Sequence, residues 1–334
     1  MNRRPDLPTL AASVDERELL QLLMQGAVSG AALARRFGVS RAAIWKRIQW
    51  LRAAGMVIHA SAGRGYALAQ DIDLLDAETI RAALSAPAQA ELNRIELAWS
   101  IDSTNAELLR RAAPAQASAV LMAEHQTVGR GRRGRCWASP LAANLYLSVS
   151  RRYTSGLAPL GGLSLVAGIA VVDALRALGV ASAALKWPND IVIAGRKLGG
   201  VLVEGSGEAA GMARAVIGLG LNVRMPSGVS EGIEQPWTDL ATAMSPPPLR
   251  NVLAVQLLDH LLPACALFDH VGLAPFLPRY ARYDALRDCT VVVHAGDVRH
   301  QGRALGVAQD GALRVEIDAV ERRFHAGEVS VRAQ

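Results

Sequence analysis

The sequence predicts an α+β protein with three parts: an N-terminal winged helix-turn-helix, a central mixed α/β domain and a small C-terminal β-domain. Apolar residues recur at helical spacing up to Gly55. An acidic, polar stretch at 67–92 then precedes a strand-like run at 95–101, and strand-type alternation replaces the helical period near Asp284. These changes set the predicted boundaries, with the winged helix at 1–68, a linker and the central domain at 69–283, and the C-terminal domain at 284–334.

The composition agrees with a globular chain of two or three compact units. The chain has 334 residues, of which 51% are hydrophobic and 20% charged, and a domain usually takes ~100 to 200 residues. The net charge is +6, and basic residues concentrate at 35–64 and 130–135, where each group can face phosphate. The cysteines are odd in number and form no CxxC pair, which argues against a disulfide framework and a structural zinc site and favours a reducing cytoplasm: Cys136, Cys265 and Cys289.

Neither export nor a membrane partner is expected. The first residues lack the apolar core of a secretory signal. The stretch between Arg152 and Asp173 carries no charge, and ~20 apolar residues are enough to cross a bilayer. Because this stretch opens with polar residues, a proline and several glycines, only about 163–178 is predicted to be helical. A buried core helix is therefore the preferred interpretation, and the predicted location is the cytoplasm.

The N-terminal segment has the pattern of three short helices that end at Gly26, Gly38 and Gly55. Its centre, SGAALARRFGVSRAAIWKRIQWLR, has the helix, glycine-containing turn and helix of a helix-turn-helix, in which the start of the second helix meets DNA bases. Alternating residues then lead to a Gly-Arg-Gly tip typical of a β-wing. The predicted DNA-binding residues are Ser40, Arg41, Ala42, Ala43, Lys46, Arg47 and Arg64.

Two alternatives stay open for this segment. Its basic residues can simply solvate one face of a three-helix packing module, and helix-turn-helix units also serve as protein contacts. Trp45 and Trp50 lie on the same short helix. One of them is expected in the core and the other at the surface near DNA, but the sequence does not distinguish them.

The most informative stretch of the central domain is AEHQTVGRGRRGRCWASP. Gly129, Gly131 and Gly134 satisfy GxGxxG, yet no helix pattern follows them, as a dinucleotide-binding turn requires. Four arginines crowd the same loop. The pattern favours an anion-binding loop, with a solvated surface loop as the alternative.

Two further motifs lie downstream. In LKWPNDIVIAGRKLGGVLVE, the runs at 191–193 and 198–203 are predicted to pair as strands around an Ala-Gly-Arg turn. Lys186, just before them, is interpreted as a half-buried cation that holds one anion, or alternatively as an exposed lysine at a strand end. The run VIGLGLN at 216–222 is predicted to be a buried strand whose glycines admit a ligand or another backbone closely. Alone, it is equally typical of a core strand.

Together these motifs resemble the biotin protein ligases. DSTN at 102–105, the GRGRRGR loop, KWPND, RKLGGVLVE and GLGLN occur in that family's order and approximate spacing. The winged helix and the C-terminal β-domain resemble the bifunctional class, in which the ligase also represses the biotin operon. The resemblance implies a catalytic domain of the biotin/lipoate ligase type and an SH3-like C-terminal β-barrel. It also implies two steps: biotin and ATP form biotinyl-5′-AMP, and a lysine of a carrier protein then displaces AMP.

The resemblance implies the following site. Two anions must approach each other in the first step, so fixed cations matter more than a nucleophile or base, and Arg132 and Lys186 are the catalytic candidates. The residues implied for biotin are Ser103, Thr104, Asn105, Gln126, Arg130, Gly131, Arg132 and Lys186. Those implied for the adenylate are Gly129, Arg135, Trp137, Asn222 and Trp237. The alternative for Ser103 and Thr104 is a helix N-cap, and for Trp237 a place in the core.

The resemblance also implies the ligands and partners. The substrates are ATP and biotin, and Mg²⁺ is expected with ATP, although no protein ligand for it can be named. The protein partners are the biotin carboxyl carrier protein of acetyl-CoA carboxylase and a second copy of the chain, as an adenylate-bound homodimer on operator DNA. The rival interpretations are a biotin-sensing regulator without catalysis and a lipoate ligase, but the latter lacks the winged helix and the GRGRRGR loop.

Overall fold

The computed structural model describes residues 15–154, 156, 158–207, 212–230, 233–296, 298–326 and 329–333. The chain divides into two compact units, Met1–Ile72 and Asp73–Gln334. The central and C-terminal segments fall in the same unit because one hydrophobic core runs through both.

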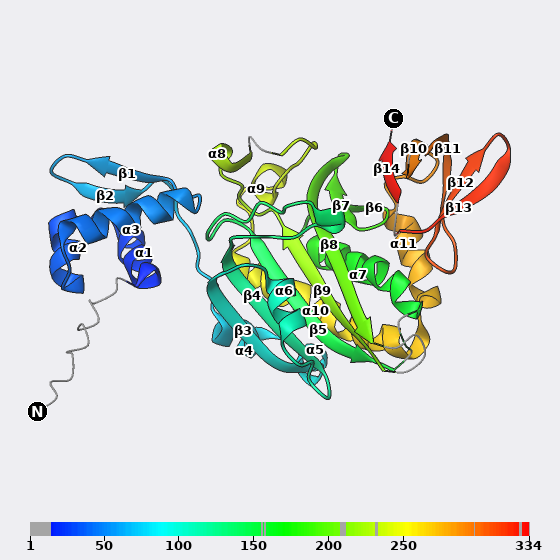
Figure 1. Ribbon diagram of the computed structural model, residues 1–334, viewed down its shortest axis with the longest axis horizontal. Coiled ribbons are helices and arrows are strands. Elements are labelled where there is room, and N and C mark those ends of the chain that lie inside the picture. Colours follow the sequence, from blue (N-terminus) through cyan, green and yellow to red (C-terminus); the bar gives the residue numbers. More distant parts are fainter. Residues whose placement is uncertain are drawn as a thin grey trace, which may run out of the picture. The chain divides into compact units, whose positions relative to one another are not determined.

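The N-terminal unit has the predicted winged helix-turn-helix (Figure 1). Its helices are α1 (Glu16–Met24), α2 (Gly30–Phe37) and α3 (Arg41–Ala53), and the strands β1 (Ile58–Ser61) and β2 (Gly65–Leu68) form the wing. The side chains of Asp15, Ser29 and Ser40 cap the three helices by accepting backbone N–H bonds. Leucine and isoleucine from all three helices form the buried core. The predicted ends of the helices are confirmed to within two residues.

The second unit is built on a seven-stranded sheet with the order β3-β4-β5-β9-β8-β7-β6 (Figure 1). Only β3 and β4 run parallel, and the other neighbours are antiparallel. The strands are β3 (Leu92–Ile101), β4 (Ser118–Gln126), β5 (Leu145–Tyr153), β6 (Ala184–Lys186), β7 (Asp190–Ile193), β8 (Arg196–Gly207) and β9 (Ala213–Leu221). The two predicted strand runs after Lys186 pair as expected around a turn at Ala194 and Gly195, which both have positive φ.

Helices cover both faces of this sheet. Alternate residues of β4, β5 and β9 enter the main core with α7 (Leu163–Ala177) and α10 (Arg250–Val271). The intervening residues face α6 (Thr104–Arg110), which packs on Leu121 and Val216. The remaining helices are α4 (Ala77–Ala83), α5 (Ala86–Ala90), η1 (Arg132–Gly134), η2 (Ala158–Gly162), α8 (Ser227–Ser230), α9 (Leu240–Ala243), η3 (Ala274–Phe276) and α11 (Leu277–Tyr283).

The helices of this unit correct one sequence-based expectation and confirm another. The stretch predicted as an acidic linker contains α4 and α5, which pack against α10. Two segments in the described part of the chain are long and apolar enough to cross a membrane, at Leu160–Ala177 and Arg250–Val271. Their central helices α7 and α10 contact each other in the core, and the helix predicted at 163–178 is confirmed as a buried one.

The C-terminal segment is a five-stranded antiparallel sheet with the order β13-β12-β11-β10-β14. Its strands are β10 (Thr290–Ala295), β11 (Val298–Val307), β12 (Leu313–Ile317), β13 (Val320–Phe324) and β14 (Val329–Ala333). An Asp-Gly pair between two strand runs predicts a hairpin with a type I′ turn at Asp310-Gly311. The hairpin is confirmed, since β11 and β12 pair across this loop, but the type I′ turn is wrong. Only Gly311 of the pair has positive φ, and the loop closes through bonds between Ala308 and Ala312 and from Gly311 to Ala308.

Candidate active site

The floor of the candidate site is the sheet face that carries α6. Gly218 and Gly220 of β9 point to this face, because the residues between them in the strand enter the opposite core. A Cβ at Gly218 would lie 2.3 Å from Asn105 Oδ1, and a Cβ at Gly220 would lie 2.5 Å from Trp137 Cε2. Neither glycine has positive φ. The GLGLN glycines are therefore required by what packs on them, which agrees with the predicted close approach.

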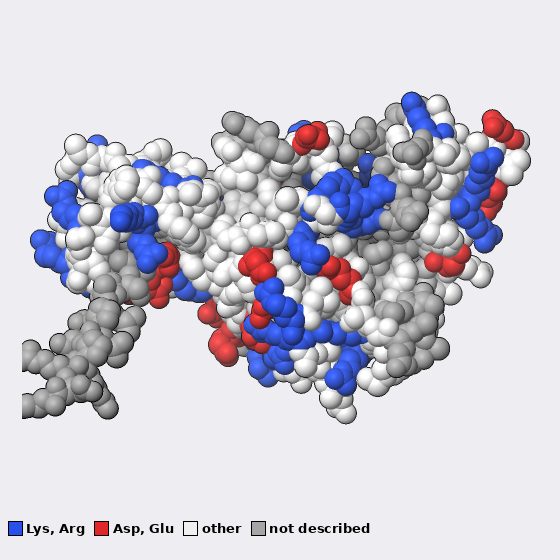
Figure 2. Space-filling view, in the orientation of Figure 1, with Lys and Arg blue, Asp and Glu red and all other residues white. Residues whose placement is uncertain are grey.

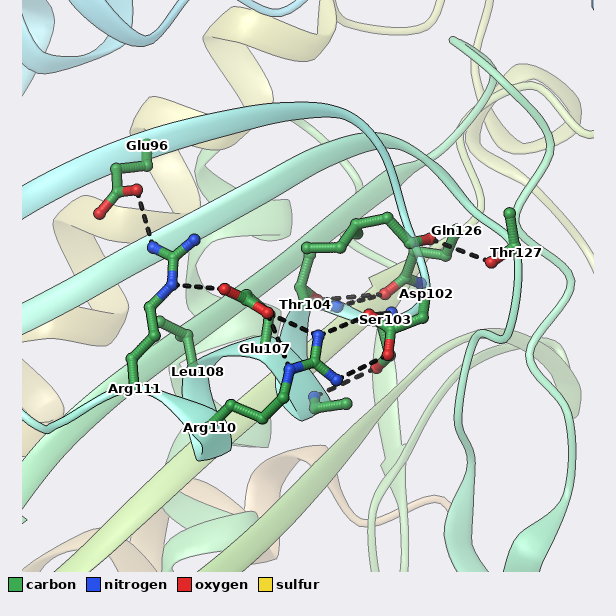
Figure 3. A network of polar contacts seen from close by, with 12 residues as sticks. Glu96, Asp102, Ser103, Thr104, Glu107, Leu108, Arg110, Arg111, Gln126 and Thr127 are labelled. Carbon is green, nitrogen blue, oxygen red and sulfur yellow. Dashed lines mark hydrogen bonds and ion pairs between the residues drawn. The ribbon is translucent and has the colours of Figure 1, made fainter.

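The DSTN motif begins α6 and is joined to the end of β4 by hydrogen bonds (Figure 3). Ser103 caps the helix, as the alternative interpretation of this residue expects. The backbone N–H and the hydroxyl of Thr104 both donate to Gln126 Oε1, at 2.9 and 3.2 Å. The Gln126 amide in turn donates to Ser139 Oγ at 3.0 Å. The side chain of Gln126 is thus fixed by protein atoms at both ends.

Asn105 connects the helix to two other motifs. Its Oδ1 accepts a bond from the hydroxyl of Ser148, which is 0% exposed, at 2.6 Å. Its Nδ2 donates to Glu204 Oε2 at 2.9 Å, and the other oxygen of Glu204 lies 3.2 Å from Arg130 Nη1. Asn105 therefore ties α6 to β5 through Ser148 and to β8 through Glu204, and Glu204 in turn contacts the arginine loop.

An ion-pair network holds the outer side of α6 (Figure 3). Both oxygens of Asp102 accept from Arg110, at 2.7 and 2.9 Å, and Arg110 and Arg111 also contact Glu107. The hydrogen bonds from Arg110 lower the pKa of Asp102 to about 2. These side chains are largely exposed, and exposed pairs contribute little to stability. The network therefore orients the DSTN turn more than it stabilises the fold.

The arginine loop forms a short hairpin. Its ends are tied by bonds from Trp137 N to Gly129 O and from Gly131 N to Arg135 O, and Arg133 at its tip has a φ of 58°. The Arg132 guanidinium donates to Asn189 Oδ1 at 3.1 Å and to the carbonyl of Ala326, in the turn that follows β13 of the C-terminal domain.

Burial lowers the pKa of Arg132, but an arginine stays charged at neutral pH. One predicted catalytic cation therefore links the loop, the KWPND motif and the C-terminal domain.

Lys186 ends β6 and lies opposite Asp190 in the β6–β7 pair. Its side chain is half-buried, as the anion-holding interpretation expects, and the alternative of a fully exposed lysine is wrong. The next residue, Trp187, is buried and donates from Nε1 to Gly311 O at 3.0 Å. Figure 2 shows Lys and Arg side chains gathered over the region of the β7 and β8 hairpin.

Two buried polar atoms of this region have no hydrogen-bond partner among the described residues. They are Trp137 Nε1 and Asn222 Oδ1. The other end of the Asn222 amide donates to Thr238 O at 3.0 Å, so the orientation of the side chain is fixed. Lys197 Nζ lies 5.5 Å from the centroid of the Trp137 ring and 2.7 Å from Asp190 Oδ1. A buried polar atom without a partner costs ~1 to 3 kcal/mol, so these two atoms indicate the place of a polar ligand.

The structure brings most of the predicted ligand residues to one region of the second unit. Trp237 is half-buried and pairs with Lys197, and Arg135 is exposed on the loop. Reasoning from sequence missed Ser139, Ser148 and Glu204. Glu204 closes the RKLGGVLVE motif and thus carried a signal, whereas the two serines carried none. Within the described residues, no group of three or more His, Cys, Asp or Glu side chains is placed to hold a metal ion.

The predicted DNA-binding residues belong to the N-terminal unit. Ser40 caps α3, with its Oγ accepting from Ala43 N at 3.1 Å. Arg47 donates to Glu16 of α1 at 2.6 Å, so its guanidinium also fastens α1 to α3. The other predicted side chains are exposed, except for the half-buried Ala43: Arg41, Ala42, Lys46 and Arg64. Of the two tryptophans, Trp45 is the exposed one, at 54%, and Trp50 is half-buried.

Comparison with known proteins adds independent findings. Three family models match: the biotin/lipoate A/B protein ligase family at residues 97–222, an HTH domain at 16–67 and the biotin protein ligase C-terminal domain at 287–332. The chain is 41% identical over 316 residues to a protein named bifunctional ligase/repressor BirA from Salmonella typhimurium, covering 94% of this chain and 97% of that protein. The protein of the same name from Escherichia coli is 40% identical over 95% of this chain and 97% of its own length.

Among solved structures, a biotin protein ligase from Aquifex aeolicus in complex with biotin and ATP is similar to the chain. It covers 72% of this chain and 100% of its own length, with 25% identity and a TM-score of 0.63. The family matches and this similarity confirm the predicted fold class: an N-terminal helix-turn-helix, a central ligase-type domain and a small C-terminal β-domain.

Proposed function

Because the chain belongs to the family of bifunctional biotin protein ligases and repressors, we propose that it activates biotin with ATP and transfers it to a protein. In the first step the carboxylate of biotin attacks the α-phosphate of ATP, which gives biotinyl-5′-AMP and pyrophosphate. In the second step a lysine amine of the carrier displaces AMP. The observation that carries this proposal is the pair of unpartnered buried atoms, Trp137 Nε1 and Asn222 Oδ1, beside the arginine loop.

The first step needs fixed positive charge. A carboxylate and a phosphate repel each other, so cations that are already in position lower the barrier without reorganising during the reaction. Arg132 is held by Asn189 and Ala326, and Lys186 is half-buried at the end of β6. These two residues neutralise the reacting groups. Mg²⁺ bound to the phosphates of ATP supplies further positive charge, and we assign no side chain to it.

The neutral groups bind the two ends of the product. The uncharged ring of biotin needs neutral donors and acceptors, and these are supplied around the DSTN turn and the loop by Ser103, Thr104, Asn105, Gln126, Arg130 and Gly131. The adenylate lies toward Gly129, Arg135, Trp137, Asn222 and Trp237. Asn222 Oδ1 accepts from the amine of adenine, and the Trp137 indole stacks on the base. A ligand there gives Asn222 Oδ1 the hydrogen-bond partner that it otherwise lacks.

The partners follow from the same family membership. The acceptor is the biotin carboxyl carrier protein of acetyl-CoA carboxylase, and the reaction takes place in the cytoplasm. The N-terminal unit binds operator DNA through α3 and the wing, as a homodimer that forms when the adenylate is bound. Arg196 and Lys197, at the start of β8, lie near the dimer interface. Ligand occupancy is thereby linked to association and repression. For the functional domains we propose the boundaries expected from the sequence, after residues 68 and 283.

Biotin-dependent exchange of pyrophosphate into ATP tests the first step by itself. The wild-type chain catalyses this exchange. In Lys186→Met the rate falls by about a hundred-fold or more, as expected when one preorganised charge at the reacting groups is lost. Arg299→Met is the matched control, because Arg299 is exposed on β11, and it keeps the wild-type rate. A folded wild-type chain that binds biotin but exchanges no pyrophosphate would make the chain a biotin-sensing regulator instead of a ligase.

A further inference from the structure

The helix α3 presents one face to solvent. Ile44, Ile48 and Leu51 are fully buried and face the core of the N-terminal unit. Arg41, Ala42, Trp45 and Lys46 are exposed, and their spacing of one, four and five positions places them on one face of a helix. This face begins at the N-terminal end of the helix, which is the part that enters the major groove in helix-turn-helix proteins.

An exposed tryptophan at position 45 is unexpected if this face of α3 contacts only water. Its side chain is 54% exposed, although the isoleucine and leucine side chains of α3 are buried and Trp50 is half-buried. With the amide of Gln49 oriented so that its oxygen meets the nearby donors, Gln49 accepts from Trp45 Nε1 at 3.3 Å and from Arg52 Nη1 at 3.2 Å. Arg52 also donates to the carbonyl of Ile58 at 2.7 Å. The indole is therefore held in place, and its one polar atom is already used.

The surface that Trp45 presents to a partner is therefore an apolar ring flanked by cations. Arg41 and Lys46 flank it on the same face, whereas the acidic side chains of α1 are engaged in ion pairs: Glu16 with Arg47 and Glu18 with Arg36. Such a surface is complementary to a polyanion that carries apolar groups between its charges. In the major groove of DNA, the apolar group is the 5-methyl group of thymine.

We propose that the Trp45 indole recognises thymine methyl groups in the major groove, and that it thereby sets part of the sequence preference of the operator. This inference rests on the proposed operator binding. Lys46 contacts a phosphate, Arg41 contacts a phosphate or a base edge, and both contribute affinity. Trp45 contributes a preference for thymine at one place in each half-site.

The test starts from selection of random duplex DNA by the full-length chain in the presence of biotin, ATP and Mg²⁺. Thymine is expected at one fixed position in each half-site. Replacing that thymine by deoxyuridine removes only the methyl group, and the wild-type dissociation constant is expected to rise by about four-fold for each methyl lost. The Trp45→Ala variant should bind thymine and deoxyuridine duplexes equally, whereas Trp45→Phe should keep part of the difference.

Lys46→Ala is the matched control on the same face. It should weaken binding to all duplexes alike and reduce the dependence on salt, because it removes one phosphate contact, but the four-fold difference between thymine and deoxyuridine should remain. If the wild-type chain selects a sequence yet binds both duplexes equally, the role of Trp45 is refuted while operator binding stands. If the chain selects no sequence at all, the proposed operator binding fails together with the inference. Loss of ligase activity in Trp45→Ala without a change in thymine preference would instead assign the indole to a contact within the protein and overturn the inference.

Discussion

The buried ion pair between Glu124 and Arg250 gives the sharpest test of the packing. Glu124 is 0% exposed and Arg250 is 1% exposed, and their side chains meet at 2.8 Å between Oε2 and Nη1. Glu124 Oε1 also accepts from Leu75 N at 2.6 Å, and Arg250 donates to the carbonyls of Asp73 and Asn144. The pair thus joins the first residues of the second unit to β4 and α10.

Replacing Glu124 by Gln keeps the shape of the side chain and removes its charge. The Arg250 guanidinium then stays buried with Asp73 as its nearest carboxylate, at 3.5 Å. Breaking a buried pair by removing one partner costs ~3 to 5 kcal/mol, because the other charge loses its compensation. We expect Glu124→Gln and Arg250→Met each to lower the free energy of unfolding of this unit by about that amount. The double variant Glu124→Gln/Arg250→Met should lose clearly less than the sum of the two single losses.

Urea unfolding measures these losses in the free energy of unfolding. Because a chain with two units need not unfold in one step, hydrogen exchange of peptides from α10 and β4 assigns the transition to the second unit. Leu249→Ala is a suitable control, because Leu249 is exposed. A loss below ~1 kcal/mol for Glu124→Gln would show that water reaches the pair, as at an exposed site. The burial argument would then be refuted.

Three further predictions concern the candidate site. Gly220→Ala pushes the Trp137 ring away from β9 and should make biotinyl-5′-AMP dissociate about ten-fold faster. Gly161→Ala is the control, because an added Cβ there has no neighbour within 4 Å, and it should leave the dissociation rate unchanged. Equal dissociation rates in the two variants would contradict the role of Gly220. Arg132→Ala should speed dissociation by about ten- to a hundred-fold, through loss of a charged hydrogen-bond donor, and undiminished retention of labelled adenylate on a filter would refute this. Arg110 depresses the pKa of Asp102 to about 2, so the pair stabilises the fold above the unfolded pKa and that contribution is lost as the pH falls through about 2. Asp102→Asn should therefore lower the melting temperature slightly at pH 7 and by clearly less at pH 2, where about half of the Asp102 carboxyl groups are protonated. A constant difference between these pH values contradicts the assignment.

The local elements follow from sequence because their signals are local. Glycines after apolar runs mark the ends of α1, α2 and α3, and serine caps begin two of these helices. The turn at Ala194-Gly195 and the hairpin before β12 follow from turn residues between strands. The Asp310-Gly311 pair predicts the hairpin but not its turn type, because the loop closes one residue earlier, through Ala308, and the dipeptide alone does not show this.

The candidate site was predicted less completely, for a physical reason. Motifs at 102–105, 129–137 and 186–190 were recognised separately, and the sequence does not show which side chains join them. Ser148 meets Asn105 across 43 residues, and Glu204 meets it across 99. Such contacts depend on strand order and on which face of the sheet a residue occupies. The exposure of Trp45 instead of Trp50 is likewise a property of the packed unit.

Transfer of labelled biotin to a purified biotin carboxyl carrier domain, with ATP and Mg²⁺ present, measures the proposed ligase activity directly. We expect the wild-type chain to label one lysine of the carrier, Lys186→Met to label almost none, and Arg299→Met to label it at the wild-type rate. A folded wild-type chain that binds biotin and leaves the carrier unlabelled would contradict the assignment of this protein as a ligase.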